Sequence, residues 1–112
     1  MTPKKSVLEQ LPVENPNAAI ERRRLTGERL ELIDYRYQPG STFPMHAHES
    51  EQLTVVLAGE LVFVFEEGEE RLQPGEALLI EGGRPHGAYV PAGASVTHTY
   101  NVFTPVRERP PG

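Results

Sequence analysis

The sequence predicts an all-β domain, a barrel or sandwich of roughly eight short strands. Its 112 residues suffice for one compact domain. The 10 glycines and 11 prolines divide the chain into short segments that end in tight turns. Between those turns apolar residues alternate with a period of two, and no stretch sustains the period of a helix. These features favour strands over helices throughout the chain.

The N-terminal half is predicted to hold an arm and two strands. Residues 1–17 contain three prolines and no clean periodicity, which indicates an irregular arm. Such an arm packs across a neighbouring subunit or forms a loose tail, and the sequence favours neither. A strand is expected at 18–25 and, after a Thr-Gly turn, another at 28–37. In the second strand Tyr35 and Tyr37 share a face that points to the barrel interior or to a second subunit.

The C-terminal half is divided by glycine and proline turns into shorter strands. Residues 52–58 are rich in β-branched residues, and a glycine then turns the chain back into the short apolar strand 61–65. A short segment at 71–72 leads into the next Pro-Gly turn. Further strands are expected at 77–80, 86–90 and 94–103.

Composition excludes several classes of protein. The chain has no cysteine, so it has neither a disulfide framework nor a thiolate metal site. No apolar run approaches the roughly 18 residues of a membrane span, and no apolar segment follows the N-terminal lysines as in a signal peptide. The net charge of -5 argues against nucleic acid and anionic membrane as partners. We therefore expect a cytoplasmic protein whose barrel spans residues 18–107 between the arm and a frayed tail at 108–112.

Two segments carry histidines between regularly placed glycines. The first reads Gly40-x5-His46-Ala47-His48-x3-Gln52-x6-Gly59, and the second reads Gly75-x5-Glu81-x-Gly83-x2-His86. Residues at i and i+2 of a strand point to the same face, so His46 and His48 are expected to project together. Gln52 can return to that face after a bend, and His86 starts a different strand after a Gly-Gly turn. Imidazole nitrogens with an amide oxygen suit one divalent transition metal such as Mn, Fe, Ni or Zn.

Other interpretations of these polar residues remain open. His46 and His48 can be two polar residues of an exposed strand, although the second histidine segment favours a metal site. His98 lies in the last strand, where a packed or solvent-facing histidine is the more common case. Glu49 and Glu51 flank the histidines in a segment expected to be a solvated loop, the alternative being a carboxylate that orients an imidazole.

The two segments resemble the motifs of the cupin superfamily, G-x5-H-x-H-x3,4-E-x6-G and G-x5-P-x-G-x2-H-x3-N. The first motif matches at Gly40, His46, His48 and Gly59, with Gln52 in the acidic position. The second matches at Gly75, Gly83 and His86, with Glu81 in place of the proline and Val90 in place of the asparagine. The resemblance implies a cupin double-stranded β-helix, which is a jelly-roll-like barrel, and a homodimer. The metal in the barrel mouth would be held by His46, His48, Gln52 and His86.

Glutamine at position 52 changes the chemistry expected of such a site. A glutamate would bring a negative charge to the metal and could act as a base, whereas glutamine is a neutral donor through its amide oxygen. The metal would keep more of its charge and be a stronger Lewis acid toward a bound water or carbonyl. Gln52 would also hold the metal less tightly than a glutamate.

The last strand carries a second, narrower resemblance. Residues 101–107 read N-V-F-T-P-V-R and are similar to the D-V-F-S-P-x-R segment of single-domain cupins that process unsaturated uronates from pectin and alginate. Those cupins also use a glutamine as third ligand and promote opening of the sugar acid to its linear keto form. The resemblance implies that Phe103 and Arg107 are site residues, with Arg107 pairing a substrate carboxylate. Asn101 replaces the aspartate expected to transfer a proton, and an amide cannot act as general acid or base.

Strand parity adds candidates for the pocket wall. If Gln52 points inward, Thr54 does too, and Phe63 lines the barrel unless it is plain core packing. The predicted substrate-binding set is Arg107, Phe103, Asn101, Thr54 and Phe63. Arg107 can instead be an exposed arginine near the tail. These patterns assign no catalytic residue.

Three functions are compatible with such a site. The first is a metal-dependent enzyme that acts on a small, acidic sugar or keto acid by isomerisation, tautomerisation or hydration. A dioxygenase is an alternative within that class if the metal is iron or nickel. The second is a barrel that binds or senses a small ligand without turnover, which the amide at Asn101 favours. The third, a structural barrel with a vestigial site, fits poorly with three ligand histidines.

Overall fold

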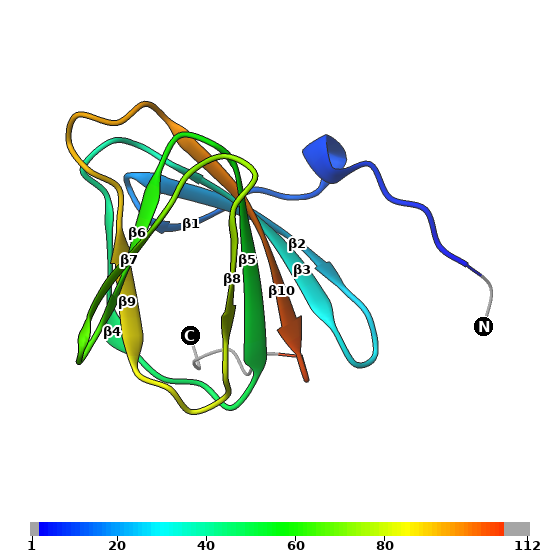
Figure 1. The fold of residues 1–112 in the computed structure, drawn as a ribbon. Coiled ribbons are helices and arrows are strands. Elements are labelled where there is room, and N and C mark those ends of the chain that lie inside the picture. Colours follow the sequence, from blue (N-terminus) through cyan, green and yellow to red (C-terminus); the bar gives the residue numbers. More distant parts are fainter. Residues whose placement is uncertain (1–2, 107–112) are drawn as a thin grey trace.

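Two facing antiparallel β-sheets form the fold, as the computed structural model, which describes residues 3–106, shows (Figure 1). The described residues contain ten strands and one short 3-10 helix, η1 (Leu8–Gln10). Within this part of the chain, no helix has the length and apolar character needed to cross a membrane. The prediction of an all-β fold is confirmed.

The larger sheet has six strands and the smaller sheet has four. In spatial order, the larger sheet contains β1 (Glu14–Asn17), β2 (Ile20–Thr26), β3 (Glu31–Tyr37), β10 (Thr97–Thr104), β5 (Glu51–Ala58) and β8 (Ala77–Ile80). The smaller sheet contains β4 (Thr42–His46), β9 (His86–Tyr89), β6 (Leu61–Phe65) and β7 (Gly68–Leu72). Apart from the consecutive pairs β1–β2, β2–β3 and β6–β7, neighbouring strands come from distant parts of the chain. This is the jelly-roll-like arrangement expected of a double-stranded β-helix.

Alternate residues of the strands face the space between the sheets and form the core. On β3, Ile33, Tyr35 and Tyr37 are buried, which answers the question of which way the tyrosines face. On β5, Thr54 and Val56 are buried as the parity predicts. The inner faces of β5 and β10 are unusual because five buried polar side chains lie there, namely Gln52, Thr54, Thr97, Thr99 and Asn101.

The outer face of the larger sheet carries a row of aliphatic side chains across five strands. Successive cross-strand partners in this row are Leu79, Leu53, Val102, Leu32 and Leu25. Leu79 is 68% exposed. His98 also belongs to this outer face, where its Nε2 lies 2.7 Å from Oδ1 of Asp34.

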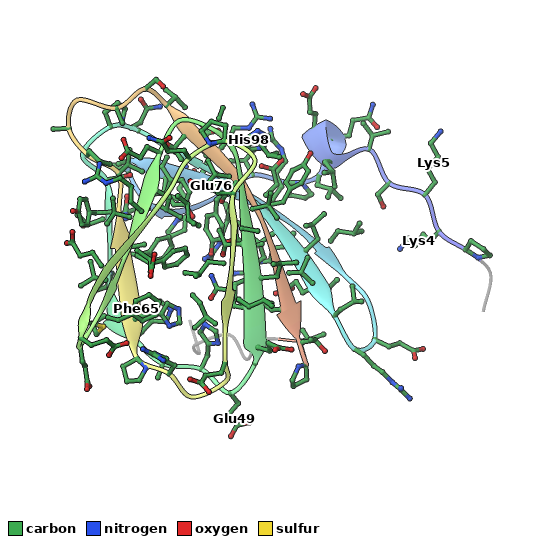
Figure 2. The ribbon with its side chains drawn as sticks, in the orientation of Figure 1. Lys4, Lys5, Glu49, Phe65, Glu76 and His98 are labelled. Carbon is green, nitrogen blue, oxygen red and sulfur yellow. The ribbon has the colours of Figure 1, made fainter. Side chains whose placement is uncertain are left out.

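Three strands depart from the ranges expected from the sequence. β4 was not predicted, because Pro44 and the polar His46 interrupt the alternation of its apolar residues. β7 already starts at Gly68, three residues before the short segment expected at 71–72. β1 lies within the segment expected to be irregular, while Lys4 and Lys5 lie on the part of the arm that extends away from the barrel (Figure 2).

Glu14 fastens β1 to β2. Its carboxylate accepts hydrogen bonds from Nε of Arg24 at 2.6 Å and of Arg22 at 3.0 Å. Arg24 also pairs with Glu31, which is fully buried. The hydrogen bond from Arg24 is the main cause that lowers the pKa of Glu14 below its ordinary value of 4.5.

Replacing Glu14 by glutamine tests this attachment. Ionised Glu14 is the form that the arginines bind, so its contribution to stability is present above its unfolded pKa of about 4.5 and is lost as the pH falls through the lower folded-state pKa. Glu14→Gln should therefore lower the melting temperature modestly at pH 7 and by less at pH 3, as followed by circular dichroism. Glu21→Gln, at an exposed position of β2, is the control and should change the melting temperature little. An equal loss at both pH values for Glu14→Gln would contradict the assignment.

Candidate metal centre

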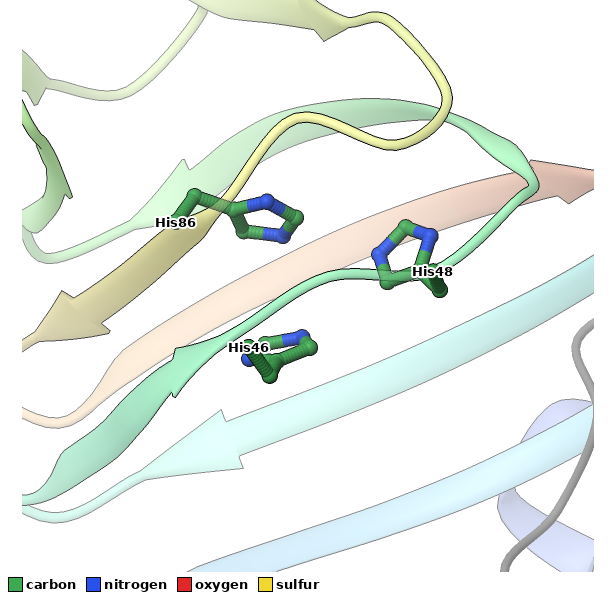
Figure 3. Close-up of side chains that lie close together, drawn as sticks. All are labelled: His46, His48 and His86. Atoms are coloured by element: carbon green, nitrogen blue, oxygen red, sulfur yellow. The ribbon is translucent and has the colours of Figure 1, made fainter.

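Three histidine rings meet where β4 ends and β9 begins (Figure 3). His46, the last residue of β4, is the cross-strand partner of His86, the first residue of β9, and their ring centroids are 4.6 Å apart. The ring of His48 lies 5.5 Å from that of His46 and 5.1 Å from that of His86. The ligand atoms of the three side chains all lie within 4.8 Å of one another, so this cluster could hold a metal ion.

A bulge in β4 turns His46 into the barrel. Phe43 pairs with Ala88 and His46 pairs with His86, so three steps along β4 match two along β9. The extra residue shifts the alternation of the strand and brings His46 to the same inner cavity as Phe43. Pro44 lies within this irregular step, where its lack of an N–H does not interrupt a regular ladder.

His48 lies in the loop after β4, so the expectation that it shares a strand with His46 is wrong. A backbone contact with the second histidine segment positions it instead, because the amide of Gly83 donates to the carbonyl oxygen of His48 at 2.7 Å. A Cβ at Gly82 would lie 2.2 Å from the carbonyl oxygen of Glu49. The Gly-Gly pair is therefore what allows the two loops to approach.

The δ nitrogens of all three rings face backbone carbonyl oxygens. These pairs are His46 with Pro44 at 2.9 Å, His48 with Ser50 at 2.9 Å and His86 with Arg84 at 2.8 Å. A carbonyl oxygen only accepts, so Nδ1 of His46 and Nδ1 of His86 donate their hydrogens. Nδ1 of His48 also lies 3.0 Å from the Ser50 hydroxyl, and it can donate to the Ser50 carbonyl oxygen in the same way. The neutral rings then carry their lone pairs on Nε2, the tautomer that a metal-binding histidine uses when its other nitrogen is held by a backbone oxygen.

Gln52, near the start of β5, brings an amide oxygen to the same cluster. Its Oε1 lies 3.1 Å from Nε2 of His48. This contact is a hydrogen bond when Nε2 of His48 carries the hydrogen. With the hydrogen on Nδ1, the same distance matches that between two ligands of one cation, since ligands each about 2.1 Å from it lie about 3.0 to 3.4 Å apart. Ligands on opposite sides of such a cation are about 4.2 Å apart. The ligand atoms of the histidines, which lie within 4.8 Å of one another, would therefore need to move only slightly closer together. The donor set therefore fits a divalent transition metal.

A line of hydrogen bonds runs from Gln52 into the sheet. Nε2 of Gln52 donates to Oγ1 of Thr54 at 2.9 Å, and the Thr54 hydroxyl donates to Oδ1 of Asn101 at 2.6 Å. Nδ2 of Asn101 donates to Oγ1 of Thr99 at 2.8 Å and to the carbonyl oxygen of Ile33 at 3.3 Å. Thr54 is 0% and Asn101 is 1% exposed. Although both were expected to contact a substrate, their polar atoms are engaged within the protein.

Aromatic side chains surround the small cavity beside the histidines. The rings of Tyr35 and Tyr37 stack at 5.5 Å, and Phe43 meets both of them edge-on. The cavity has a volume of about 30 Å³, which is room for one or two water molecules. Among the described residues that line it there is no lysine, arginine or carboxylate. Burial, and secondarily the neighbouring Tyr35, raises the pKa of Tyr37, so its hydroxyl remains neutral at physiological pH.

The other candidate residues divide between this cavity, the surface and the undescribed end of the chain. The ring of Phe103 packs 5.5 Å from that of His48, and the ring of Phe63 lies 6.2 Å from that of His86. Arg107 lies outside the described residues. Glu49 is exposed and, in Figure 2, points away from the barrel at the end opposite to His98. Phe43 was missed because it reaches the cavity only through the bulge.

A larger cavity of about 440 Å³ lies along the edge strands β7 and β8. Its charged lining residues are Glu51, Glu67, Glu69, Glu70, Glu81 and Arg84. Arg84 pairs with Glu67 and Glu81 and lies over the ring of Phe65, 5.0 Å from its centroid. The excess of carboxylates disfavours anions on this side of the barrel.

The bulged strand pair, the convergent histidines and the glycine-bracketed loops agree with a comparison against protein families. A family model described as Cupin domain matches residues 33–103. The chain belongs to the cupin family. A comparison with the curated proteins finds no match.

Solved structures of other cupins support the fold of this cupin over nearly its whole length. KdgF from Halomonas sp. is 21% identical with a TM-score of 0.85, and the match covers 96% of this chain and 97% of that one. An RmlC-like cupin from Shewanella frigidimarina is 23% identical with a TM-score of 0.83, covering 96% and 95% of the two chains. The polyketide cyclase RemF from Streptomyces resistomycificus is 28% identical with a TM-score of 0.80, covering 98% of this chain and 83% of that one.

Substitution of Gly82 tests whether the two loops must touch to form the cluster. Gly82→Ala should destabilise the fold by about 1–3 kcal/mol, because a methyl group would collide with the backbone of Glu49. The displaced loop carries His48, so metal affinity should fall as well. Gly93→Ala is the matched control, since nothing lies within 4 Å of a Cβ there. Urea denaturation and metal titration of both variants measure the effects, and equal stability of the two variants would contradict the role of Gly82.

Proposed function

We propose that this cupin binds one divalent transition metal through His46, His48, Gln52 and His86 and uses it to process a small carbonyl compound. The observation that carries the proposal is the convergence of four neutral donors, three imidazole nitrogens and one amide oxygen, on one point. The reaction class it favours is isomerisation or tautomerisation. A neutral donor set leaves the charge of the metal uncompensated, which suits an oxygen on which negative charge develops.

The chain and the metal would divide the work. The metal supplies Lewis acidity toward a carbonyl oxygen. The backbone carbonyls hold the three rings in the tautomer that offers Nε2, and Phe103 packs against the His48 ring. The aromatic wall keeps bulk water from the reacting group, which strengthens electrostatic interactions there. Tyr35 and Tyr37 line the same cavity, and a neutral tyrosine hydroxyl can donate a hydrogen bond to a substrate oxygen.

The cavity size limits how a substrate can bind. A space of about 30 Å³ is far below the roughly 300–1,000 Å³ that encloses a whole ligand. Only the reacting group would enter, and the rest of the molecule would lie across the barrel mouth. An acidic sugar or keto acid is supported by the resemblance of residues 101–107 to uronate-processing cupins, in which Arg107 would pair with the carboxylate.

A second substrate class is favoured by the cavity wall. The described lining residues include the rings of Tyr35, Tyr37, Phe43, Phe63 and Phe103 and no cationic side chain. Such a wall suits a flat, enolisable polyketone better than a hydroxylated sugar acid. The similarity to the polyketide cyclase RemF points in the same direction. A binding or sensing role without turnover is the alternative if neither class reacts.

The homodimer and the cytoplasmic location remain predictions. The aliphatic row on the outer face of the larger sheet is a surface that a contact between two copies would bury. Its most exposed member is Leu79, at the edge of the sheet. The mass of the protein in solution would establish whether such a contact forms.

Metal content is the first test of the site. Untagged protein analysed by inductively coupled plasma mass spectrometry should carry about one equivalent of Mn, Fe, Ni or Zn. His48→Ala should lose most of this metal because it removes one ligand. His98→Ala is the control, since His98 pairs with Asp34 on the outer face and should leave the metal in place. Wild-type protein that takes up none of the four metals after incubation would overturn the proposed site.

Ligand-induced stabilisation distinguishes the two substrate classes. D-galacturonate should raise the melting temperature of the metal-loaded protein if the acidic sugar is the right class, and benzoylacetone should do so if the polyketone is. D-glucose is the neutral control, and His48→Ala should abolish either response. Deuterium uptake next to the carbonyl in D₂O, followed by NMR, then separates an enolising enzyme from a binding module. No stabilisation by either compound would rule against both classes.

A further inference from the structure

We infer that Asn101 is a positioning residue that acts through Thr54 to aim the amide oxygen of Gln52 at the three histidines. This inference rests on the proposed metal site and adds to it a reason why an asparagine stands at position 101. It assigns Asn101 and Thr54 to the support of a metal ligand, in place of the substrate contacts expected from the sequence.

The direction of the hydrogen bonds starts at the backbone of β3. The carbonyl oxygen of Ile33 can only accept, so the atom of Asn101 that faces it must be Nδ2. Nδ2 also reaches Oγ1 of Thr99, two residues away on the same face of β10. With both contacts made by Nδ2, Oδ1 of Asn101 is left pointing at β5.

Thr54 passes this direction on to Gln52. Its hydroxyl has one hydrogen, which it gives to Oδ1 of Asn101 at 2.6 Å. The oxygen of that hydroxyl can then only accept from Gln52, so the amide group 2.9 Å away must present Nε2. The other end of the amide, Oε1, is therefore the end that faces His48.

Because these side chains are buried, the Gln52 amide is confined to this orientation. Gln52 is 6% exposed and Thr54 is 0% exposed, so solvent does not offer alternative partners along the line. A reversed Gln52 amide would set Oε1 against Oγ1 of Thr54, whose hydrogen is already donated to Asn101. It would also place Nε2 next to Nε2 of His48, where it could donate to the lone pair that a metal needs. The line of hydrogen bonds from Asn101 through Thr54 to Gln52, called the relay below, thus favours the amide orientation that binds a cation. It disfavours the orientation that would compete with the cation for His48.

An aspartate at position 101 could not start the relay in the same way. Its oxygens would both be acceptors, and one would face the carbonyl oxygen of Ile33 with no hydrogen between them. The amide satisfies all of the contacts at this fully buried position without a charge. The departure from the aspartate of the similar uronate cupins therefore has a structural explanation.

Thr54 is the position at which the relay can be cut with little change of shape. Thr54→Val removes the hydroxyl, and we expect the affinity for Zn²⁺, measured by isothermal titration calorimetry, to fall about 10- to 100-fold, the range typical for partners of metal ligands. Thr54→Ser retains the hydroxyl and should bind Zn²⁺ within about threefold of the wild type. Valine and serine variants with the same Zn²⁺ affinity would overturn the inference.

A double-mutant cycle separates orientation from packing. In a Gln52→Glu background either carboxylate oxygen can face the metal, so the orientation no longer matters. Adding Thr54→Val there should lower the Zn²⁺ affinity by less than about threefold. A loss as large as in the Gln52 background would mean that Thr54 acts through packing alone, which would overturn the relay.

The unmodified, metal-free chain provides a readout that does not depend on any variant folding. Nuclear Overhauser contacts should run from the side-chain amide hydrogens of Gln52 to Thr54, and these hydrogens should exchange slowly with solvent. Zn²⁺ binding by a protein whose Gln52 hydrogens exchange rapidly and lack that contact would overturn the relay and leave the metal site. The expected contact without binding of any metal would support the relay and remove the proposed function.

Discussion

The pairing of β4 with β9, and the single extra residue within it, is the interaction on which the site depends. The extra residue brings both Phe43 and His46 to the inner face, and it ends the strand with His46 opposite His86. The two backbones are close enough that a Cβ at Gly87 would lie 3.0 Å from the carbonyl oxygen of Phe43. The loop that follows is held by the Gly83 amide, which fixes His48 as well. Backbone geometry, not side-chain packing alone, therefore brings the histidine segments together.

A second constraint acts on the inner faces of β5 and β10. Buried polar groups must find partners inside the protein, because water cannot supply them. The amide nitrogen of Gln52 and the side chains of Thr54, Thr99 and Asn101 meet this requirement through one another and through one backbone oxygen. A network whose buried polar groups are hydrogen-bonded is rigid. The direction in which its hydrogen bonds run is set by the carbonyl oxygen of Ile33, which can only accept. The apolar core around it then only has to exclude water.

Much of the fold could be predicted because alternation is a local property. The division of β3 into two faces and the inner face of β5 followed from a period of two, although the period leaves open which face of β3 points inward. The glycine-bracketed histidines indicated the cupin fold that the family match confirms. β4 could not be found in this way, because a proline and a bulge break its period. The contacts of Asn101 could not be predicted from local patterns either, because its hydrogen bond with Thr54 joins residues 47 positions apart and depends on strand register.

The two amides at positions 52 and 101 belong to one electrostatic arrangement. The general cupin motif has a glutamate at position 52, and the segment of the uronate cupins has an aspartate at position 101. Here both residues are neutral amides, joined through the Thr54 hydroxyl by hydrogen bonds. The chain as a whole has a net charge of -5, yet no described residue that lines the metal cavity is a carboxylate, and several glutamates line the separate cavity between β7 and β8. A cation held by neutral donors in a water-poor cavity would be balanced only by an anion from outside the protein or one formed during a reaction. Neutral ligands, an amide relay and an aromatic wall together therefore favour chemistry in which negative charge grows on a substrate oxygen.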